Sequence, residues 1–401
     1  MLPRLIVTLA VGTCILTIAR AEGFDWLWKA PRKHVNTVIR TAEGTKILQG
    51  PKVALLPNGA LVTVVAHSNY ASDAVVSDVE IEWFISHDGG LTWHRSDPLP
   101  PDAAPRLNKY PTWPVRLKDG ALLTIGSYGW ENSTDTPEKR KELAAQGYYL
   151  FTPEEGNAKG VVSIIHRVWM SRSDDGGKTW KTSDIALPAM PHLALYRDPL
   201  VTRGGTVIQP MWGRFDLKRE PKRVSSLVLR SEDNGASWEL RTVAKAVDFD
   251  FNETSIAEAP NGDLVALIRT TGQRELWTAI STDAGRTWSA PRNSGLLGST
   301  PFLVTTKDAL IVAVYMRRAT HPGGGGFTQT GVFACVSRDN GRTWDVEHQV
   351  CLVDAGTEVV DGYPSAVALP DGSVYAVSGF HGARAIGGTR FHPRQPAFGR
   401  G

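Results

Sequence analysis

The sequence has few cysteines, little net charge and only one long apolar run. It holds 3 cysteines in 401 residues, and its net charge of +3 is too small to indicate a nucleic-acid-binding surface. The metal-protease, zinc, P-loop and nucleophile-elbow motifs (H-E-x-x-H, C-x-x-C, G-x-x-x-x-G-K-[ST] and G-x-S-x-G) are also absent. These absences argue against several enzyme classes, and we expect no metal, no cofactor and no nucleic-acid partner.

The one long apolar run lies at the N-terminus. It extends from Leu5 to Ile18, follows a basic start and precedes an A-x-A sequence that ends at Ala21. This arrangement is typical of a secretory signal peptide. No later stretch approaches the roughly 20 apolar residues that span a bilayer. We therefore expect a secreted or periplasmic protein without a membrane span, with a signal peptide at residues 1–21 and a single domain at residues 22–401.

An eight-residue pattern, S-x-D-x-G-x-[ST]-W, recurs along the chain. Its five copies begin at Ser86, Ser173, Ser231, Ser281 and Ser337. In such a pattern the Asp carboxylate accepts backbone N–H bonds inside a turn, the Gly supplies a positive φ and the Trp packs on neighbouring strands. Each copy therefore predicts a hairpin turn fastened to the core, with a structural rather than catalytic aspartate.

A second repeat alternates with the first. It consists of two apolar strands joined by a tight turn and occurs six times, with Asn-Gly or Asp-Gly at four of the turns. The first five hairpins are each followed by the eight-residue pattern, so each unit predicts a four-stranded blade. The expected fold class is all-β, a six-bladed β-propeller with these aspartate turns between strands three and four. The N-terminal segment near residues 34–40 is expected to supply the outer strand of blade six.

Blade two carries an insert at about residues 128–167. It contains a predicted helix opened by Thr136 and Pro137, followed by an aromatic run. The insert could line a binding site or form a solvated excursion. The fifth turn is flanked by Cys335 and Cys351, which we expect on adjacent strands of one blade, either as a disulfide or as two buried thiols.

Several unrepeated polar residues reach one rim of the ring when the hairpins are aligned on their turns. Glu253 immediately precedes the first strand of blade four, and Tyr363 holds the same place in blade six. Arg269 ends the second strand of blade four, while Arg317 and Arg318 end the matching strand of blade five. Strand alternation puts Arg318 on the same face as Arg269. Convergence from separate blades predicts a functional site at this rim.

The repeated turns resemble the Asp boxes of sialidases and related propellers. The segments around Tyr363 and around Glu253 and Arg269 are similar to the nucleophile and Glu–Arg segments of exo-α-sialidases, and the resemblance covers roughly residues 45–380. It implies retaining hydrolysis of a terminal sialic acid or related acidic sugar, with Tyr363 as the nucleophile and Glu253 as its base. It also implies that arginines bind the substrate carboxylate, here Arg269, Arg318, Arg317 and Arg197.

Two features depart from the family pattern. Gln49 stands where the arginine of the first-blade R-I-P signature belongs, while Arg197 and Lys109 hold the same relative place in blades three and two. The catalytic acid is expected in the loop after the second strand of blade one, with Asp73 preferred and Asp78 as the alternative. The expected partner is a sialoglycoconjugate or other acidic glycan. The alternatives are an exo-glycosidase of different sugar specificity and a non-catalytic glycan- or protein-binding propeller.

Overall fold

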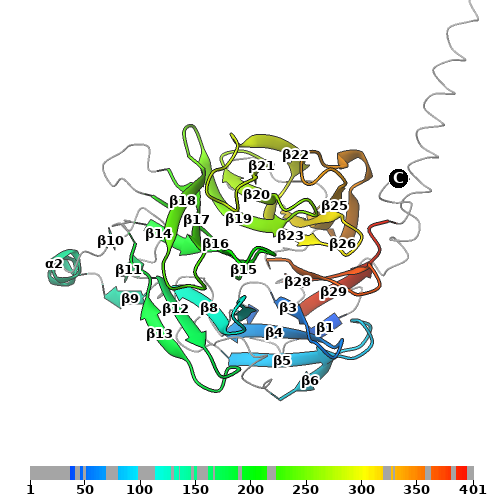
Figure 1. Ribbon diagram of the computed structural model, residues 1–401, viewed down its shortest axis with the longest axis horizontal. Helices are drawn as coiled ribbons and strands as arrows, with labels where there is room; N and C mark the ends of the chain where they lie inside the picture. Colours follow the sequence, from blue (N-terminus) through cyan, green and yellow to red (C-terminus); the bar gives the residue numbers. More distant parts are fainter. Residues whose placement is uncertain are drawn as a thin grey trace, which may run out of the picture.

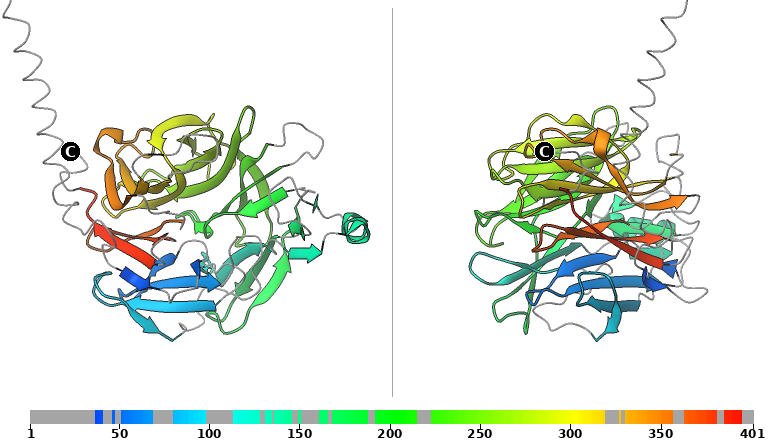
Figure 2. Two further views of the ribbon diagram at one scale, coloured as in Figure 1. Left: turned by 180° about the vertical axis from the view of Figure 1, so that it is seen from behind. Right: turned by 90° about the vertical axis from the view of Figure 1, so that its right-hand side faces the viewer.

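Six antiparallel sheets arranged in a ring make up most of this computed structural model (Figures 1 and 2). The structure describes residues 37–40, 46–47, 51–68, 80–97, 113–127, 131–134, 136–145, 149–150, 161–165, 168–187, 192–214, 223–318, 327, 330–356, 363–380 and 385–394. The predicted signal peptide lies outside these residues. None of the helices in the described ranges is long and apolar enough to cross a membrane.

Each blade is an antiparallel sheet built largely from consecutive strands. Blade one contains β3 (Lys52–Leu55), β4 (Leu61–Ser68), β5 (Glu80–Ser86) and β6 (His94–Ser96), with β2 (Lys46–Ile47) also on β4. Blade two contains β7 (Val115–Arg116), β8 (Leu122–Ser127), β12 (Val168–Ser173) and β13 (Lys181–Asp184). Blade three contains β16 (Val207–Arg214), β17 (Ser225–Ser231) and β18 (Glu239–Ala244), and both β14 (His192–Leu195) and β15 (Leu200–Val201) pair with β16.

The remaining three blades follow the same plan. Blade four contains β19 (Asp250–Glu258), β20 (Leu264–Thr271), β21 (Glu275–Ser281) and β22 (Arg292–Leu297). Blade five contains β23 (Ser299–Thr305), β24 (Ile311–Arg317), β25 (Thr330–Ser337) and β26 (Val350–Gly356). Blade six contains β27 (Ser365–Ala368), β28 (Val374–Phe380) and β29 (Ala385–Phe391), and its outer strand is β1 (Thr37–Arg40).

The pairing of β1 with β29 closes the ring. Arg40 pairs with Ala385 and Thr37 with Gly387, so the first described strand of the chain completes the last blade. The expectation that an N-terminal segment would supply this strand is confirmed. In the other blades the fourth strand follows the aspartate turn. Blade six has no such turn, and its fourth strand is β1.

The fourth aspartate turn shows the bonding that all five share. Asp283 accepts bonds from Ser281 Oγ at 2.8 Å, Thr287 N at 2.9 Å and Thr287 Oγ1 at 2.6 Å, and Gly285 N donates to Ser281 Oγ at 2.8 Å. Burial raises the pKa of Asp283, but the hydrogen bonds together outweigh it and lower the pKa to about 2. The aspartate is saturated by its own turn, as its structural role requires.

Arginines tie the turns of successive blades together. Arg172 and Arg230 each stand one residue before the serine of a turn. Arg172 Nη1 donates to Asn234 O at 3.0 Å, and Arg230 Nε donates to Ala284 O at 3.2 Å. Each acceptor is a carbonyl inside the aspartate turn of the next blade. The repeated turns thus fasten the blades to one another as well as the strands within a blade.

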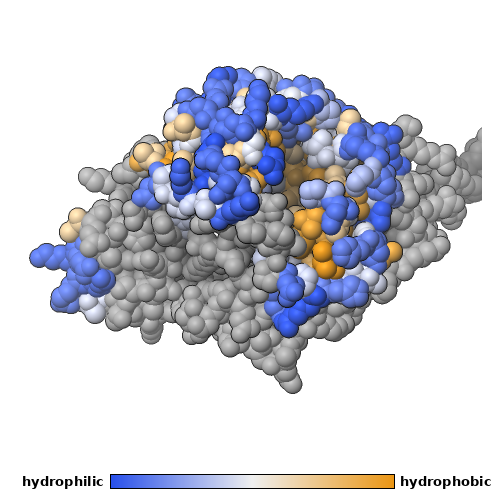
Figure 3. Space-filling model, turned by 60° about the horizontal axis from the view of Figure 1, so that its bottom comes forward, coloured by the Kyte–Doolittle hydropathy of each residue, from blue (hydrophilic) through white to orange (hydrophobic). Residues whose placement is uncertain are grey.

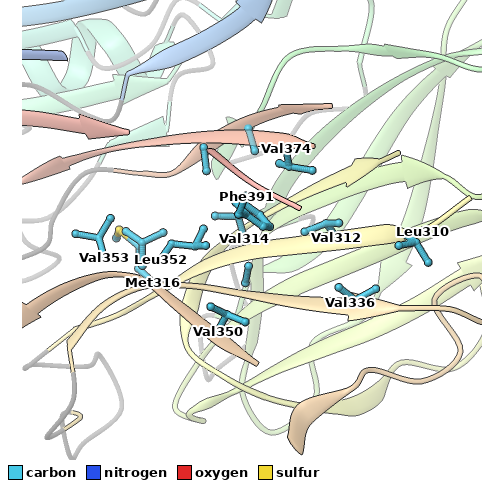
Figure 4. Close-up of a cluster of buried hydrophobic side chains, with 14 residues drawn as sticks. Leu310, Val312, Val314, Met316, Val336, Val350, Leu352, Val353, Val374 and Phe391 are labelled. Atoms are coloured by element: carbon cyan, nitrogen blue, oxygen red, sulfur yellow. The ribbon is translucent and has the colours of Figure 1, made fainter. Parts of the chain in front are cut away.

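Apolar side chains fill the spaces between blades. Figure 4 shows the cluster between blades five and six, where Val314, Val374 and Phe391 are at most 1% exposed. The second strands are buried on both faces because a blade packs against each of its neighbours. On the face shown in Figure 3, hydrophilic residues cover most of the described surface, and hydrophobic ones gather toward its middle.

The insert contains the predicted helix, and the two cysteines lie on adjacent strands as predicted. Helix α2 (Pro137–Ala145) is capped by Thr136, whose Oγ1 accepts the Lys139 N–H at 3.1 Å, and β9 (Glu131–Thr134), β10 (Tyr149–Leu150) and β11 (Val161–Ile165) form a separate small sheet. Cys335 and Cys351 lie on the adjacent strands β25 and β26 as free, buried thiols. Burial raises the pKa of each thiol to about 12, so both are protonated at neutral pH.

Candidate active site

A β-bulge in the first strand of blade four aims Glu253. The strand β19 begins at Asp250, earlier than expected, so Glu253 lies inside it rather than before it. The register with β20 shifts between Phe251 and Thr254, and Arg269 of β20 stands opposite this irregularity. A bulge places two residues against one and redirects a side chain. Glu253 is thereby turned toward its neighbours at the rim.

Glu253 bonds to two residues, one with each carboxylate oxygen. The Tyr363 hydroxyl donates to Glu253 Oε1 at 2.6 Å, and Arg269 Nη1 donates to Glu253 Oε2 at 2.5 Å. Tyr363 comes from blade six, just before β27, whereas the other two residues belong to blade four. Glu253 and Arg269 are both 8% exposed, and Tyr363 is partly buried. The structure therefore brings together three residues that the sequence placed at one rim.

The charges in this cluster hold Glu253 ionised and Tyr363 neutral. Burial raises the pKa of Glu253, but the charge and hydrogen bond of Arg269, with the Tyr363 hydrogen bond and the Arg318 charge, outweigh burial and lower it below its usual value. Burial, and next the negative charge of Glu253, raise the pKa of Tyr363 well above 10. A protonated phenol thus faces an ionised carboxylate that is already hydrogen-bonded to it. Hydrogen-bond reach of this kind is what a nucleophile requires of a general base, and the roles of the two residues stay predictions.

The two arginines after β24 have different surroundings. The Arg318 guanidinium lies 5.8 Å from the centre of the Tyr363 ring. Arg317 points elsewhere, because its Nε donates to Leu297 O at 3.1 Å and its Nη2 to Gln349 Oε1 at 2.6 Å. Of this pair, Arg318 is the one that joins the cluster, on the side that strand alternation predicts.

Arg197 is close to the cluster but is bonded to the backbone. Its Nη1 donates to Pro364 O at 2.7 Å and its Nη2 to Pro301 O at 2.8 Å, while its Nε also contacts Pro301 O at 3.3 Å. These bonds commit the guanidinium nitrogens to the backbone, and the carboxylate-binding role expected from the sequence stays a prediction. All three guanidinium nitrogens already have protein acceptors.

Two further groups were missed by sequence reasoning. The ring of Tyr196 lies 5.8 Å from that of Tyr363, and the Lys52 ammonium bonds to Asp198 Oδ1 at 2.5 Å. Asp198 stands directly before Pro199, which is the same place that Tyr363 holds before Pro364. Applying the hairpin alignment to blade three would have pointed to Asp198.

Other predicted residues lie outside the part of the chain that the structure describes. These are Asp73, Asp78, Gln49 and Lys109. Within the described ranges, no group of three or more His, Cys, Asp or Glu side chains is placed to hold a metal ion. The groups that the structure brings together at the rim are the Tyr363 phenol, the Glu253 carboxylate and the Arg269 and Arg318 guanidinium groups.

Several solved structures share this fold at low sequence identity. A protein of unknown function from Dyadobacter fermentans matches with a TM-score of 0.66 and 22% identity over 89% of this chain and 98% of its own. The leech intramolecular trans-sialidase matches with a TM-score of 0.54 and 15% identity over 89% and 70%. The GH93 α-L-arabinofuranosidase of Fusarium graminearum matches with a TM-score of 0.55 and 12% identity over 89% and 97%. At these identities the likeness concerns the fold alone.

Two sequence-family models also match the chain. No curated protein matches the chain. The BNR repeat-like domain model matches residues 148–376, more than half of the 401 residues, and the BNR/Asp-box repeat model matches residues 84–95 around the first aspartate turn. These matches agree with the six blades and the bonded aspartate turns described above. The chain belongs to the BNR repeat-like domain family.

Proposed function

We propose that this protein is a retaining exo-glycosidase that hydrolyses a terminal α-linked sialic acid or a related acidic sugar. The observation that carries the proposal is the bond of 2.6 Å between the Tyr363 hydroxyl and Glu253, with Arg269 bonded to the other carboxylate oxygen. A tyrosine next to a buried base is the nucleophile that glycosidase chemistry uses for a sugar with a charged anomeric centre. Sialidases among the proteins of similar fold support the same reading.

In the proposed first step, the Tyr363 oxygen attacks the anomeric carbon while Glu253 takes the phenol proton. The C–O bond to the leaving group breaks, and an acid donates a proton to the departing oxygen. We assign this acid to Asp73, with Asp78 as the alternative, in the stretch of sequence between β4 and β5. Water then attacks the anomeric carbon and gives its proton to the carboxylate of the catalytic acid, while the bond to Tyr363 breaks and Glu253 returns the proton to the Tyr363 oxygen. The anomeric configuration is retained.

The reason for a tyrosine is electrostatic. A sialic acid carries a carboxylate on its anomeric carbon, which would repel a carboxylate nucleophile but not a neutral phenol. Since burial and the Glu253 charge raise the pKa of Tyr363 well above 10, the phenol arrives protonated and neutral. We assign the binding of the sugar carboxylate to Arg269 and Arg318, because a guanidinium matches a carboxylate with two parallel hydrogen bonds.

A second candidate is an exo-glycosidase of different sugar specificity. It is favoured by Gln49, which stands in place of the first-blade arginine, and by the bonds that commit Arg197 to backbone carbonyls. Loss of one charged contact to a carboxylate would weaken binding by about 1.5–3 kcal/mol. A non-catalytic glycan-binding propeller is the third candidate, but binding alone gives no reason for a phenol hydrogen-bonded to a buried base.

The proposed compartment is extracellular or periplasmic, on the basis of the apolar run that ends before Ala21. N-terminal sequencing of the exported protein tests it. A new N-terminus at or near Glu22 is expected. Retention of the intact leader in the cell would contradict it.

The experiment that tests the function is hydrolysis of an aryl α-sialoside by wild type, Tyr363→Phe and Tyr315→Phe. The matched control removes the same hydroxyl from the core of blade five, where Tyr315 donates to Gln349 Oε1 at 2.5 Å. We expect Tyr363→Phe to lower kcat by at least about 10³-fold, by analogy with other nucleophile deletions, and Tyr315→Phe to keep it.

The same assay separates the three candidates. Wild-type activity on aryl sialosides that Tyr363→Phe retains would contradict Tyr363 as nucleophile. Activity only on other aryl glycosides, lost in Tyr363→Phe, would favour the second candidate. No hydrolysis of any aryl glycoside, together with saturable glycan binding, would favour the third.

A further inference from the structure

Three consecutive residues of blade three extend to four other blades. They are the residues from Tyr196 to Asp198, which directly precede β15, a strand near the middle of the view in Figure 1. The Tyr196 hydroxyl donates to Pro301 O of blade five at 3.3 Å. Asp198 Oδ1 accepts from Lys52 Nζ of blade one at 2.5 Å and from the Trp113 N–H of blade two at 3.1 Å. This short segment of blade three therefore bonds to blades one, two and five.

Arg197, the middle residue, makes the longest connection. Its Nη1 donates to Pro364 O of blade six at 2.7 Å, and its Nη2 donates to Pro301 O at 2.8 Å and Thr300 O at 3.3 Å in blade five. Blades three and six stand opposite each other in a ring of six, so the bond to Pro364 crosses the central axis. The guanidinium also lies 4.7 Å from the centre of the Phe302 ring. The Arg197 side chain thus fixes the start of β23 in blade five and the start of β27 in blade six.

The backbone of Arg197 is held in an unusual conformation. Its φ is +66°, in the left-handed region that side chains other than glycine seldom adopt. The buried Gln209 supports it, because Gln209 Nε2 donates to Arg197 O at 3.1 Å. Such a conformation persists only where surrounding contacts determine it. Here those contacts direct the Arg197 side chain across the axis.

We infer that Arg197 is a positioning residue that holds Tyr363 against Glu253. Pro364 directly follows Tyr363, so anchoring its carbonyl fixes the backbone one residue beyond the residue that carries the phenol. The ring of Tyr196, from the same segment, lies 5.8 Å from the Tyr363 ring at an angle of 59° and limits its movement on one side. The bond of 2.6 Å between Tyr363 and Glu253 joins blades six and four. Its length depends on the positions of β27 and β19 relative to each other. This inference rests on the proposed function of Tyr363.

The chemistry of the guanidinium suits this role. Its planar fork donates in several directions at once, so it can bond to the carbonyls of Thr300, Pro301 and Pro364 together. A lysine ammonium would keep the charge but has neither the fork nor the reach to serve all three carbonyls. Arg197→Lys therefore separates the geometry of the contact from its charge.

The test compares Arg197→Lys with Arg230→Lys. Arg230 is the matched control, because it is 1% exposed and its Nε also donates to a carbonyl of another blade, Ala284 O, but in an aspartate turn. With an aryl α-sialoside, we expect Arg197→Lys to lower kcat by about 10- to 100-fold with KM changed less than about threefold, since small misplacements of reacting groups cost rate. Arg230→Lys should lower the melting temperature but keep kcat and KM.

A spectroscopic measurement tests the inference without any substrate. The protein has 9 tyrosines, and tyrosine labelled with ¹³C at Cζ gives one signal each, with that of Tyr363 assigned by its loss in Tyr363→Phe. We expect the Tyr363 signal to move in Arg197→Lys, because its hydrogen bond to Glu253 changes, and to stay in Arg230→Lys. If Arg197→Lys does not fold, Gln209→Met is used instead. That change removes the donor to Arg197 O, and it should move the same signal in the same direction.

The outcomes are distinct. A folded Arg197→Lys protein with wild-type kcat and an unmoved Tyr363 signal overturns the inference. A signal that moves equally in Arg230→Lys overturns it as well, because the effect would then be general loosening. A wild-type protein that hydrolyses no glycoside would contradict the proposed function, while the Tyr363 signal would still decide the role of Arg197.

Discussion

Acidic side chains serve opposite purposes in two regions of this propeller, the aspartate turns and the rim that carries Glu253. Asp283 is bonded by Ser281 and Thr287 of its own turn, and this arrangement recurs in the other four turns. Glu253 is 8% exposed, lies in one blade and bonds to a tyrosine of another blade. A repeated residue whose partners are local stabilises the blade. An unrepeated residue whose partners come from different blades is where chemistry is expected.

The largest difference between the two regions should come from removing a single carboxylate charge. We expect Glu253→Gln to lower kcat/KM by about 10²- to 10⁴-fold, because the amide cannot accept the phenol proton. Asp283→Asn should leave kcat/KM within about twofold of wild type and cost about 1 kcal/mol of stability through weakened turn hydrogen bonds. Steady-state kinetics and urea denaturation of both variants check this. A loss of activity in Asp283→Asn as large as in Glu253→Gln would erase the distinction.

The next largest difference concerns the arginine partners. Arg269→Met leaves the buried Glu253 charge without its ion pair, and we expect the free energy of unfolding to fall by about 3–5 kcal/mol. Arg172→Met removes the bond to Asn234 O and more exposed pairs with Asp119 and Asp174, whose acidic side chains are 35% and 57% exposed, and should cost about 2 kcal/mol or less. Urea denaturation at neutral pH measures both. Equal losses in the free energy of unfolding would show that the Arg269–Glu253 pair contributes no more to stability than the contacts of Arg172.

The pH dependence sharpens the comparison further. Since the Arg269 charge lowers the pKa of Glu253 against the effect of burial, the base stays ionised at neutral pH, and kcat/KM should fall only below about pH 4.5. The same sign applies to stability. A carboxylate with a lowered folded pKa stabilises the protein above its unfolded pKa, and this contribution is lost as the pH falls through the folded value. Because burial and Glu253 raise the pKa of Tyr363 well above 10, no loss of activity from phenol ionisation is expected below pH 10.

Rate and stability profiles between pH 3 and pH 10 test these expectations. An acid limb in kcat/KM centred above about pH 5.5 would contradict an ionised, arginine-paired Glu253. A fall in kcat/KM near pH 8 that persists in Glu253→Gln would show that a group other than Tyr363 and Glu253 ionises there.

The smallest effects are expected at the hairpin turns of blades four and five, where the change concerns only the backbone. Ala309 has a φ of +63°, whereas the matching residue of blade four is Gly262 with a φ of +95°. Ala309→Gly should raise the free energy of unfolding by about 1 kcal/mol, because alanine is strained in the left-handed region. Gly262→Ala should lower it by a similar amount, since nothing lies within 4 Å of the added Cβ and only backbone strain is introduced. Opposite changes in thermal denaturation confirm the pair, and changes of the same sign contradict it.

Most of the architecture could be read from the sequence because it is encoded locally and repeatedly. The serine, aspartate and glycine of each turn bond to one another within a few residues, so their spacing predicts the turn and, with the hairpins, the blade. The place of β1 followed from counting strands. The same register put Glu253, Arg269 and Tyr363 on one rim, and the structure brings their side chains into contact.

The sequence could not show how side chains cross the ring. The direction of Arg197 depends on a left-handed φ and on Gln209, which is twelve residues away. The choice between Arg317 and Arg318 depends on where β24 ends and on the carbonyl of Leu297 that captures Arg317. The bulge at Glu253 arises from the pairing of β19 with β20 and has no local sequence signal. These features are set by packing between blades rather than by neighbours in the chain.

The most direct test of the central claim is to identify the residue that becomes glycosylated during turnover. The protein is mixed with an aryl α-sialoside, quenched in acid within milliseconds, digested and examined by peptide mass spectrometry, with Glu253→Gln as a slowed variant. We expect one added glycosyl residue on the peptide that contains Tyr363, and none in Tyr363→Phe. A glycosyl adduct on any other residue, or turnover with inversion of the anomeric configuration, would contradict it.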